Sequence, residues 1–256
     1  MSTISTSTQN SLRKWNIIAG LFHLSLAVYV IVASNSFSLP ITTRYMNGPP
    51  GTSFTPTVTL FNVRIGYAVG LFLILSALFH FIVSSKFFFA KYIKGLANHI
   101  NVFRWTEYSI SSSLMIVLIA LITGITDYAA LLAIAGVNAS MILFGWLQEK
   151  YEAPKSGGWL PYIFGCIAGI VPWLIVLIAV IAPGSPSSAT PPTFVYGIIV
   201  TIFLLFNSFA LVQYKQYKAV GKWHDYIRGE RAYIILSFTA KAALAIQIFA
   251  NTLIKK

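Results

Sequence analysis

The chain alternates long apolar runs with short polar connections. Five of the runs carry no charged side chain and approach or exceed the roughly 20 residues that a helix needs to cross the hydrocarbon core of a bilayer. Two further runs are as long but contain charged residues. We therefore predict seven transmembrane helices, over approximately residues 15–33, 65–83, 96–123, 128–147, 159–182, 193–212 and 232–254.

This pattern predicts an all-α integral membrane protein with one seven-helix domain over residues 1–256. The longest connection, residues 34–58, has β-branched and aromatic residues around "NGPPG" and predicts a small β-hairpin. The first residues, "MSTISTSTQNSLRKW", are polar and show no small-residue cleavage site, so no removable signal peptide is expected.

Composition supports a membrane protein and excludes several other classes. Hydrophobic residues make up 57% of the chain and charged residues 9%, whereas about a quarter of a soluble domain is charged. The net charge of +12 does not indicate nucleic-acid binding, because membrane proteins collect Lys and Arg in their loops. The single cysteine, Cys166, lies in an apolar run, which argues against a disulfide framework or a thiolate metal site. We expect a lipid bilayer as the main partner and no bound metal.

The basic residues predict the orientation. Seven spans place the two termini on opposite sides, and positively charged loops stay in the cytoplasm. Four basic residues fall on the C-terminal side, namely Arg44, Arg64, Lys255 and Lys256. Twelve fall on the N-terminal side: Arg13, Lys14, Lys86, Lys91, Lys94, Lys150, Lys155, Lys215, Lys218, Lys222, Arg228 and Arg231. We predict a multi-pass protein of the cell membrane with a cytoplasmic N-terminus and an extracellular C-terminus.

Lys241 stands in the middle of the seventh span, where a lysine costs roughly 2.5–3.5 kcal/mol even on lenient insertion scales. At 1.5 Å of rise per residue, Lys241 lies ~3 Å from the midpoint of its span, and Glu107 lies ~5 Å from the midpoint of the third span, toward the same side. Glu107 is also the only carboxylate within a span. If Lys241 has an ionic partner, we predict that it is Glu107; a purely structural pair, or a lysine facing a wet cavity, is the alternative.

Arg104 competes for the same carboxylate. It stands one turn before Glu107, and an i,i+3 pair on one helix face could satisfy Glu107 locally. Arg104 could equally reach Glu149 or Glu230 at the inner surface. An Arg–Glu–Lys cluster is compatible with both arrangements, so the sequence leaves them open.

A buried lysine beside one carboxylate suits Schiff-base chemistry with an aldehyde. Desolvation favours the neutral, nucleophilic amine, and the carboxylate would stabilise the protonated imine. Ser237 and Ala245, each one turn from Lys241, are small and leave room for a ligand chain. Aromatic side chains could line an apolar slot for it: Trp105, Tyr108, Trp173, Phe203 and Phe206.

Seven spans, a lysine midway along the seventh and "RWTEYSISSS" on the third together resemble the microbial rhodopsins. Arg104, Trp105 and Glu107 match the R-[YW]-x-[DE] pattern of that group. The cytoplasmic N-terminus, "RWTEY", the long first outward loop and "SFTAK" are similar to one branch, the heliorhodopsins, over essentially the whole chain. The resemblance implies all-trans retinal on Lys241, Glu107 as the counterion, a slow photocycle and a homodimer.

Two groups of site residues are expected. The retinal pocket and Schiff-base surroundings are predicted to include Ser237, Trp105, Tyr108, Ser111, Ser112, Asn138, Phe203 and Phe206. His23 and His80 fall on the cytoplasmic half of the first two spans and suggest a polar cavity that takes up a proton. That cavity is predicted to contain His23, His80, Asn101, Arg104, Ser76, Glu149 and Glu230. No carboxylate or cysteine is expected to accompany the histidines.

The chain departs from pumping rhodopsins. Ser237 replaces their second carboxylate, Leu118 stands where the proton donor falls, and "GIIVTIFLLFNSFALVQY" lacks their W-x-x-Y-P motif. We therefore expect a light-sensing photoreceptor without net ion pumping, which acts through a cytoplasmic or membrane signalling partner. A light-driven or light-gated ion transporter is the alternative. No catalytic constellation is recognised, and we do not expect an enzyme.

Small residues at helical spacing favour association of two copies. "GCIAG" places Gly165 and Gly169 one turn apart on the fifth span, and Gly136 and Ser140 repeat the spacing on the fourth. Such residues let helix backbones approach closely in lipid. They could equally serve packing within the bundle.

Overall fold

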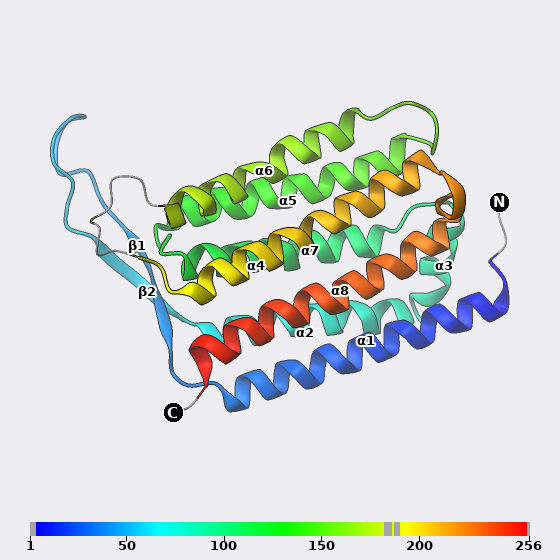
Figure 1. Cartoon of the computed structure of the whole chain (residues 1–256), viewed down its shortest axis with the longest axis horizontal. Helices are drawn as coiled ribbons and strands as arrows, with labels where there is room; N and C mark the ends of the chain where they lie inside the picture. The colour runs from blue at the N-terminus through cyan, green and yellow to red at the C-terminus, as the bar shows by residue number, and fades with distance from the viewer. Residues whose placement is uncertain (1–3, 182–185, 187–189, 255–256) are drawn as a thin grey trace.

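The computed structural model describes residues 4–181, 186 and 190–254. Seven of its helices are long and apolar enough to span a membrane. They run side by side, with the two termini at opposite ends of the bundle (Figure 1). The prediction of an all-α membrane protein with seven spanning helices is confirmed. The long helices are α1 (Thr6–Ala33), α2 (Ile65–Ser84), α4 (Val102–Ile122), α5 (Tyr128–Tyr151), α6 (Leu160–Ile181), α7 (Thr193–Lys218) and α8 (Tyr226–Ile248), the last extended by a π-helical turn, η2 (Phe249–Leu253).

The helices form a closed ring, because each packs against its successor along the chain and α8 returns to α1. Large apolar side chains on the outside of the ring remain exposed, for example Leu132 at 70% and Leu204 at 63%. A soluble protein rarely leaves so much contiguous apolar surface uncovered, whereas lipid covers it in a membrane.

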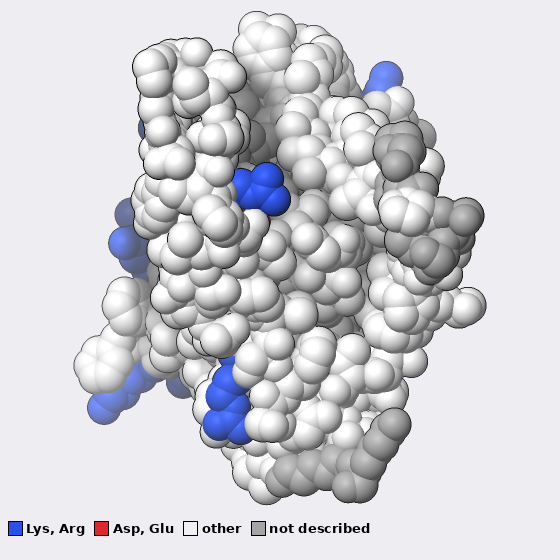
Figure 2. Space-filling model, turned by 90° about the vertical axis from the view of Figure 1, so that its left-hand side faces the viewer, with Lys and Arg blue, Asp and Glu red and all other residues white. Residues whose placement is uncertain are grey.

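The two ends of the bundle differ. One end, called here the hairpin end, carries strands β1 (Ser38–Thr43) and β2 (Val58–Arg64), which pair antiparallel with a bulge between Ile41 and Thr42. The second strand extends past the predicted loop boundary at residue 58 and leads directly into α2. Seen from this side the surface is mostly white, with few basic atoms (Figure 2). Lys255 and Lys256, which the sequence places here, lie outside the described residues.

The other end, called here the α3 end, carries the short helix α3 (Phe89–Ala97) and the turn between α7 and α8, which includes the 3-10 helix η1 (Gly221–His224). The sequence predicted one helix from residue 96 to 123, but α3 ends at Ala97 and α4 begins only at Val102. His99 adopts a left-handed backbone with φ of 60°, which ends the helical run. Asn101 then caps α4 by accepting a hydrogen bond from the Arg104 backbone N–H at 3.1 Å.

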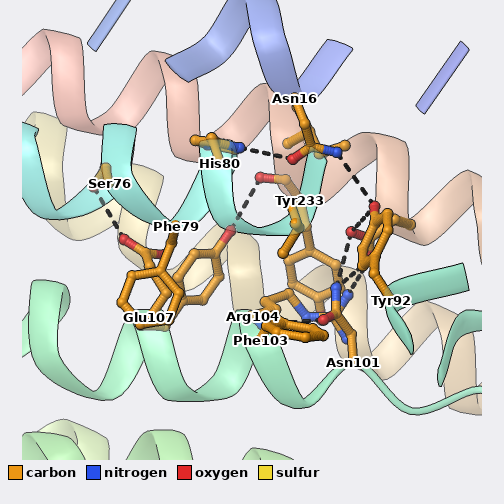
Figure 3. A pocket seen from close by; sticks show the side chains of 14 residues that line it. Asn16, Ser76, Phe79, His80, Tyr92, Asn101, Phe103, Arg104, Glu107 and Tyr233 are labelled. Carbon is orange, nitrogen blue, oxygen red and sulfur yellow. Dashed lines mark hydrogen bonds and ion pairs between the residues drawn. The ribbon is translucent and has the colours of Figure 1, made fainter. Parts of the chain in front are cut away.

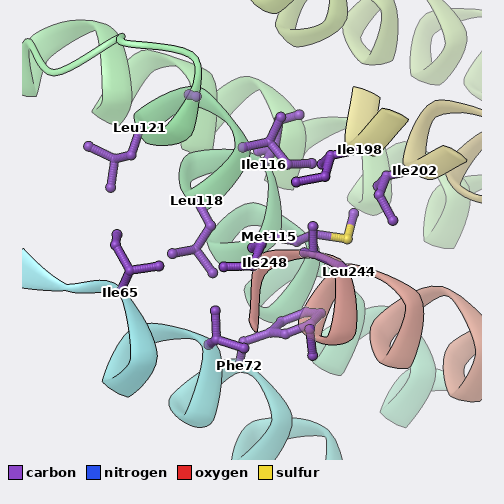
Figure 4. Packing of buried hydrophobic residues seen from close by; sticks show 14 of the residues in the cluster. Ile65, Phe72, Met115, Ile116, Leu118, Leu121, Ile198, Ile202, Leu244 and Ile248 are labelled. Atoms are coloured by element: carbon purple, nitrogen blue, oxygen red, sulfur yellow. The ribbon is translucent and has the colours of Figure 1, made fainter. Parts of the chain in front are cut away.

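The apolar core fills the hairpin half of the ring, between the level of Lys241 and the hairpin. Branched side chains from α2, α4, α7 and α8 interdigitate there (Figure 4). Phe72, Leu118 and Leu244 are each at most 1% exposed. Buried polar and charged side chains of the helices instead gather toward the α3 end, which positions the candidate site.

Candidate functional site

Lys241 and Glu107 form a buried ion pair between α8 and α4. Nζ of Lys241 lies 2.5 Å from Oε1 of Glu107, and the two residues are 5% and 6% exposed. Ser76 of α2 donates a hydrogen bond from its Oγ to the same carboxylate oxygen at 3.0 Å (Figure 3). The helical rise sets both charges at one depth. Because α4 and α8 are not successive in the ring, the ion pair joins them across its interior. A charge buried in this way is tolerated because it is paired and hydrogen-bonded.

Arg104 does not pair with Glu107. Its guanidinium instead bridges two carboxylates from other helices: Nη1 lies 2.6 Å from Oε2 of Glu230 on α8, and Nη2 pairs with Glu149 on α5. Trp105 adds a hydrogen bond from Nε1 to Oε2 of Glu149 at 2.5 Å. The sequence left open whether Arg104 pairs with Glu107 or with Glu149 and Glu230, and the structure adopts the pairing with Glu149 and Glu230. Glu107 is thereby left to Lys241.

Three further side chains complete this network, and sequence reasoning missed two of them. Oε1 of Glu230 accepts hydrogen bonds from the Tyr92 hydroxyl and from Nδ2 of Asn101, each at 2.9 Å. The Tyr226 hydroxyl donates to Oε1 of Glu149 at 2.9 Å. Burial, together with the Glu230 carboxylate, raises the pKa of Tyr92 well above its usual value, so Tyr92 stays a donor. Tyr226 lies four residues before Glu230, on the same helix face, so helical spacing could have predicted its place in the network. The spacing of Tyr92 along the chain gives no such signal.

The two histidines lie together beside this network. Their rings stack with centroids 5.7 Å apart, and Nδ1 of His80 lies 2.8 Å from Oδ1 of Asn16. His23 is fully buried, and neither ring nitrogen has a hydrogen-bond partner among the described residues. A cavity of about 40 Å³ is lined by His80 together with Glu107 (Figure 3). The expectation that no carboxylate accompanies the histidines is therefore wrong, because α2 and α4 turn the two side chains toward one space.

That cavity, called here the polar cavity, collects most of the residues predicted for it. Ser76, His80, Asn101, Arg104 and Glu230 line it. Glu149 and His23 do not line the cavity themselves: Glu149 pairs with Arg104, and the ring of His23 stacks on that of His80. Asn16, Tyr92 and Tyr233 also line it without having been predicted. Tyr233 places its ring 4.0 Å from Cζ of Arg104, a cation–π contact that helps to hold the guanidinium.

On its other side, Lys241 borders an apolar space. A cavity of about 40 Å³ is lined by Lys241, Tyr108, Phe206 and Phe209 among others. Beyond it lies a cavity of about 380 Å³ between α5, α6 and α7, lined by Trp105 and Trp173. Ile142, Phe206 and Phe209 line both cavities, so the narrow space beside the amine adjoins the wider one.

The predicted pocket residues are distributed around these cavities in three ways. Tyr108, Ser111, Ser112 and Phe206 line the narrow cavity, and Trp105 the wide one. Asn138 supports the wall by donating to Ser112 at 2.8 Å and to Ser113 at 3.1 Å. Phe203 lies behind Trp173, with ring centroids 5.2 Å apart, and Ser237 is buried one turn from Lys241.

Several lining residues were missed: Phe72, Met115, Ile142, Ile202 and Phe209 in the narrow cavity, and Met141, Gly145 and Gln213 in the wide one. Helical periodicity could have predicted two of these lining residues. Phe72 lies four residues before Ser76, and Ile202 four residues before Phe206, on the same helix faces.

The architecture defines a class: a seven-helix membrane protein with a buried lysine–carboxylate pair at the head of an apolar cavity, as in a rhodopsin. The model of the Heliorhodopsin family matches residues 12–253, and the chain belongs to that family. The family implies a light-sensing rhodopsin with a retinal chromophore.

Other comparisons bear on the fold. A solved structure described as the transmembrane domain and linker region of Salpingoeca rosetta rhodopsin phosphodiesterase is similar with a TM-score of 0.58 and 14% identity, covering 96% of this chain and 71% of that chain. At this identity the likeness shows the fold alone. No curated protein sequence matches the chain.

The residues present fit a retinal group. The buried amine of Lys241 borders a narrow apolar cavity that adjoins a wider one, and these spaces suit a slender apolar chain ending in a bulkier ring. The hydroxyls of Ser111 and Ser237 are buried near Lys241 without a hydrogen-bond partner among the described residues. Buried hydroxyls are normally satisfied, so their place beside the amine is consistent with a polar group of a ligand there.

Proposed function

We propose that this protein is a photoreceptor that binds all-trans retinal through a Schiff base on Lys241, with Glu107 as the counterion. The single observation that carries the proposal is the 2.5 Å ion pair at the head of the apolar cavity. Retinal, when bound, supplies absorption of visible light and isomerisation. Glu107 would hold the proton at Nζ of Lys241, and Ser76 would fix the carboxylate by donating to it.

The ionisable groups near the pair lie on one side of it among the described residues. From Glu107 toward the α3 end follow Ser76, His80 and Asn16, within hydrogen-bonding or cavity contact of one another. His80 and His23 lie on this side, and in our proposal they are the groups that receive a proton released at Nζ. On the opposite side, the described helices contain no Asp, Glu, His, Lys or Arg between the level of Lys241 and the rim at Arg64 and Asp127.

This one-sided arrangement supports a slow photocycle without net ion transport. A proton that leaves Nζ toward the polar cavity would return by the same route, because buried apolar side chains such as Leu118 and Leu244 fill the other side. A pump needs an acceptor and a donor on opposite sides. A return without a dedicated donor is slow, and a slow cycle suits signalling to a partner better than ion flux.

Two features of the assembled protein belong to the same proposal. The α3 end would face the cytoplasm, because it collects most of the basic residues. A homodimer would use α5: a Cβ on Gly136 would meet nothing within 4 Å, and Ser140 is exposed one turn away. Gly165 and Gly169 instead face Met141 of α5, so the "GCIAG" motif serves packing within the bundle.

The test begins with a visible spectrum of the protein purified with all-trans retinal. A visible band that hydroxylamine bleaches, and all-trans isomer on extraction in the dark, are expected. A protein that forms no pigment would refute the proposal and leave the ion pair structural.

Transport is tested separately on the pigment. Illuminated vesicles are expected to show no sustained pH change, and voltage-clamped cells no sustained photocurrent. A pH change abolished by a protonophore would replace the sensor by a transporter while leaving the chromophore assignment intact.

A further inference from the structure

A second candidate binding site lies at the α3 end, on the turn between α7 and α8. A groove of about 550 Å³ opens there, called here the basic groove, lined by Lys222, Trp223, Arg228, Arg231, Ala232 and Ile235 among others. Its volume falls within the roughly 300–1,000 Å³ typical of ligand sites. It shares no lining residue with the polar cavity or with the cavities beside Lys241.

The groove is positively charged and its cations are free of ion pairs. Lys222, Arg228 and Arg231 are exposed, and none lies within 4.0 Å of a carboxylate among the described residues. Asp225 is the one acidic residue in the lining, and its Oδ1 accepts the Ile227 backbone N–H at 2.9 Å, capping α8. Three unpaired cations in one groove favour an anion, and Arg in particular matches phosphate oxygens.

Trp223 organises the charged part of the groove. Nζ of Lys215 and Cζ of Arg228 each lie 5.4 Å from its ring centroid, so that two cations contact one indole. These contacts restrain the guanidinium before any ligand binds. Tryptophan is also enriched at the level of lipid headgroups, where its amphipathic ring bridges water and hydrocarbon.

The other part of the groove is apolar and lies on the spanning helix α8. Ala232 and Ile235 follow Arg231 within the next turn of α8, and Ile235 is 50% exposed. The order along the groove is therefore cation, aromatic ring, then apolar side chains within the spanning helix. A phospholipid presents the matching order of phosphate, interface and acyl chain. A free phosphate or an acidic peptide in solution would use only the charged part.

We propose that the basic groove binds the phosphate headgroup of an anionic phospholipid, with an acyl chain along Ala232 and Ile235. Each basic residue near an anionic lipid surface contributes roughly a fivefold change in binding. Removal of three would then weaken binding about a hundredfold. The site requires only that the α3 end lies at a membrane surface, so it stands independently of the chromophore.

The experiment is native mass spectrometry of the full chain in detergent with phosphatidylglycerol or phosphatidylcholine added. The test variant is Lys222→Gln/Arg228→Gln/Arg231→Gln. The matched control is Lys86→Gln/Lys91→Gln/Lys94→Gln, which removes the same charge from the same end, beside α3 and within it. We expect tighter binding of phosphatidylglycerol than of phosphatidylcholine, a large loss in the test variant and a loss below about threefold in the control. Equal losses in both variants would overturn the site in favour of general surface charge.

Two further arms identify the source of the phosphate. Inorganic phosphate in large excess is expected not to displace the lipid, and Ile235→Asp is expected to weaken lipid binding while leaving the cations in place. Displacement by phosphate, with no effect of Ile235→Asp, would overturn the lipid assignment in favour of a soluble anion. The single variant Arg231→Gln, compared with Lys91→Gln, repeats the test if the triple variant does not purify.

Discussion

The two halves of the bundle, on either side of Lys241, solve the problem of burial differently. The α3 half buries Arg104 between Glu149 and Glu230, and these two carboxylates accept further hydrogen bonds from donors on α3, α4 and α8. The hairpin half buries branched apolar side chains, among them Leu118 on the same helix as Arg104. Paired charge holds the α3 half together, and apolar packing holds the hairpin half together. The contrast teaches that, among the described helices, the ionisable side chains near Lys241 lie on one side of it only.

Removing the amine at the boundary between the halves should have the largest effect. Lys241→Ala is expected to abolish the visible pigment and to leave Glu107 buried without its partner, a loss of about 3–5 kcal/mol in the free energy of unfolding. Absorbance and thermal melting of the purified protein measure both. The double variant Lys241→Ala/Glu107→Gln should regain much of the stability without regaining pigment. A visible band in either variant would exclude Lys241 as the attachment point.

Neutralising the carboxylate tests which half supplies the counterion. Glu107→Gln is expected to shift the visible band to longer wavelength, because a counterion stabilises the ground state more than an excited state with displaced charge. Loss of the proton would instead move the band to the near-ultraviolet. Glu149→Gln is the matched control in the α3 half and should leave the band nearly in place. An unchanged spectrum of Glu107→Gln at neutral pH contradicts the assignment.

Breaking the charge network measures how the α3 half is held together. Arg104→Gln leaves Glu149 and Glu230 without their cation and should cost about 3–5 kcal/mol of unfolding free energy. Arg104→Lys keeps the charge but loses the forked geometry, and we expect a smaller loss. Denaturation in mild detergent provides the comparison. Stability of Arg104→Gln within about 1 kcal/mol of the parent would mean that the carboxylates are neutral rather than paired.

Substitutions at two glycines should have the smallest effect on stability. They distinguish packing within the bundle from packing between two copies of the protein. A Cβ on Gly169 would lie 2.5 Å from Sδ of Met141, so Gly169→Val should destabilise the bundle by about 1–3 kcal/mol. Gly136→Val should leave thermal stability close to that of the parent and reduce the dimer fraction in detergent. An intact dimer in Gly136→Val would move the proposed interface away from α5.

The sequence by itself determined whatever depends on distance along a helix. Apolar length gave the seven spans, and the rise per residue set Lys241 and Glu107 at one level before any contact was known. The same reasoning listed Ser76, His80, Asn101 and Glu230 on one side, where the structure gathers them. These predictions need only helical geometry, which every span shares.

Only the tertiary structure decided what depends on which helix is the neighbour and how each is rotated. The choice of Glu149 and Glu230 over Glu107 by Arg104, and the insertion of Tyr92 from α3, follow from the closed ring and from the break at residues 98–101. The inward turn of Gly165 and Gly169, and the walls formed by Phe72 and Phe209, have the same origin. Periodicity places a side chain on a face of its helix, but packing between helices decides what that face meets.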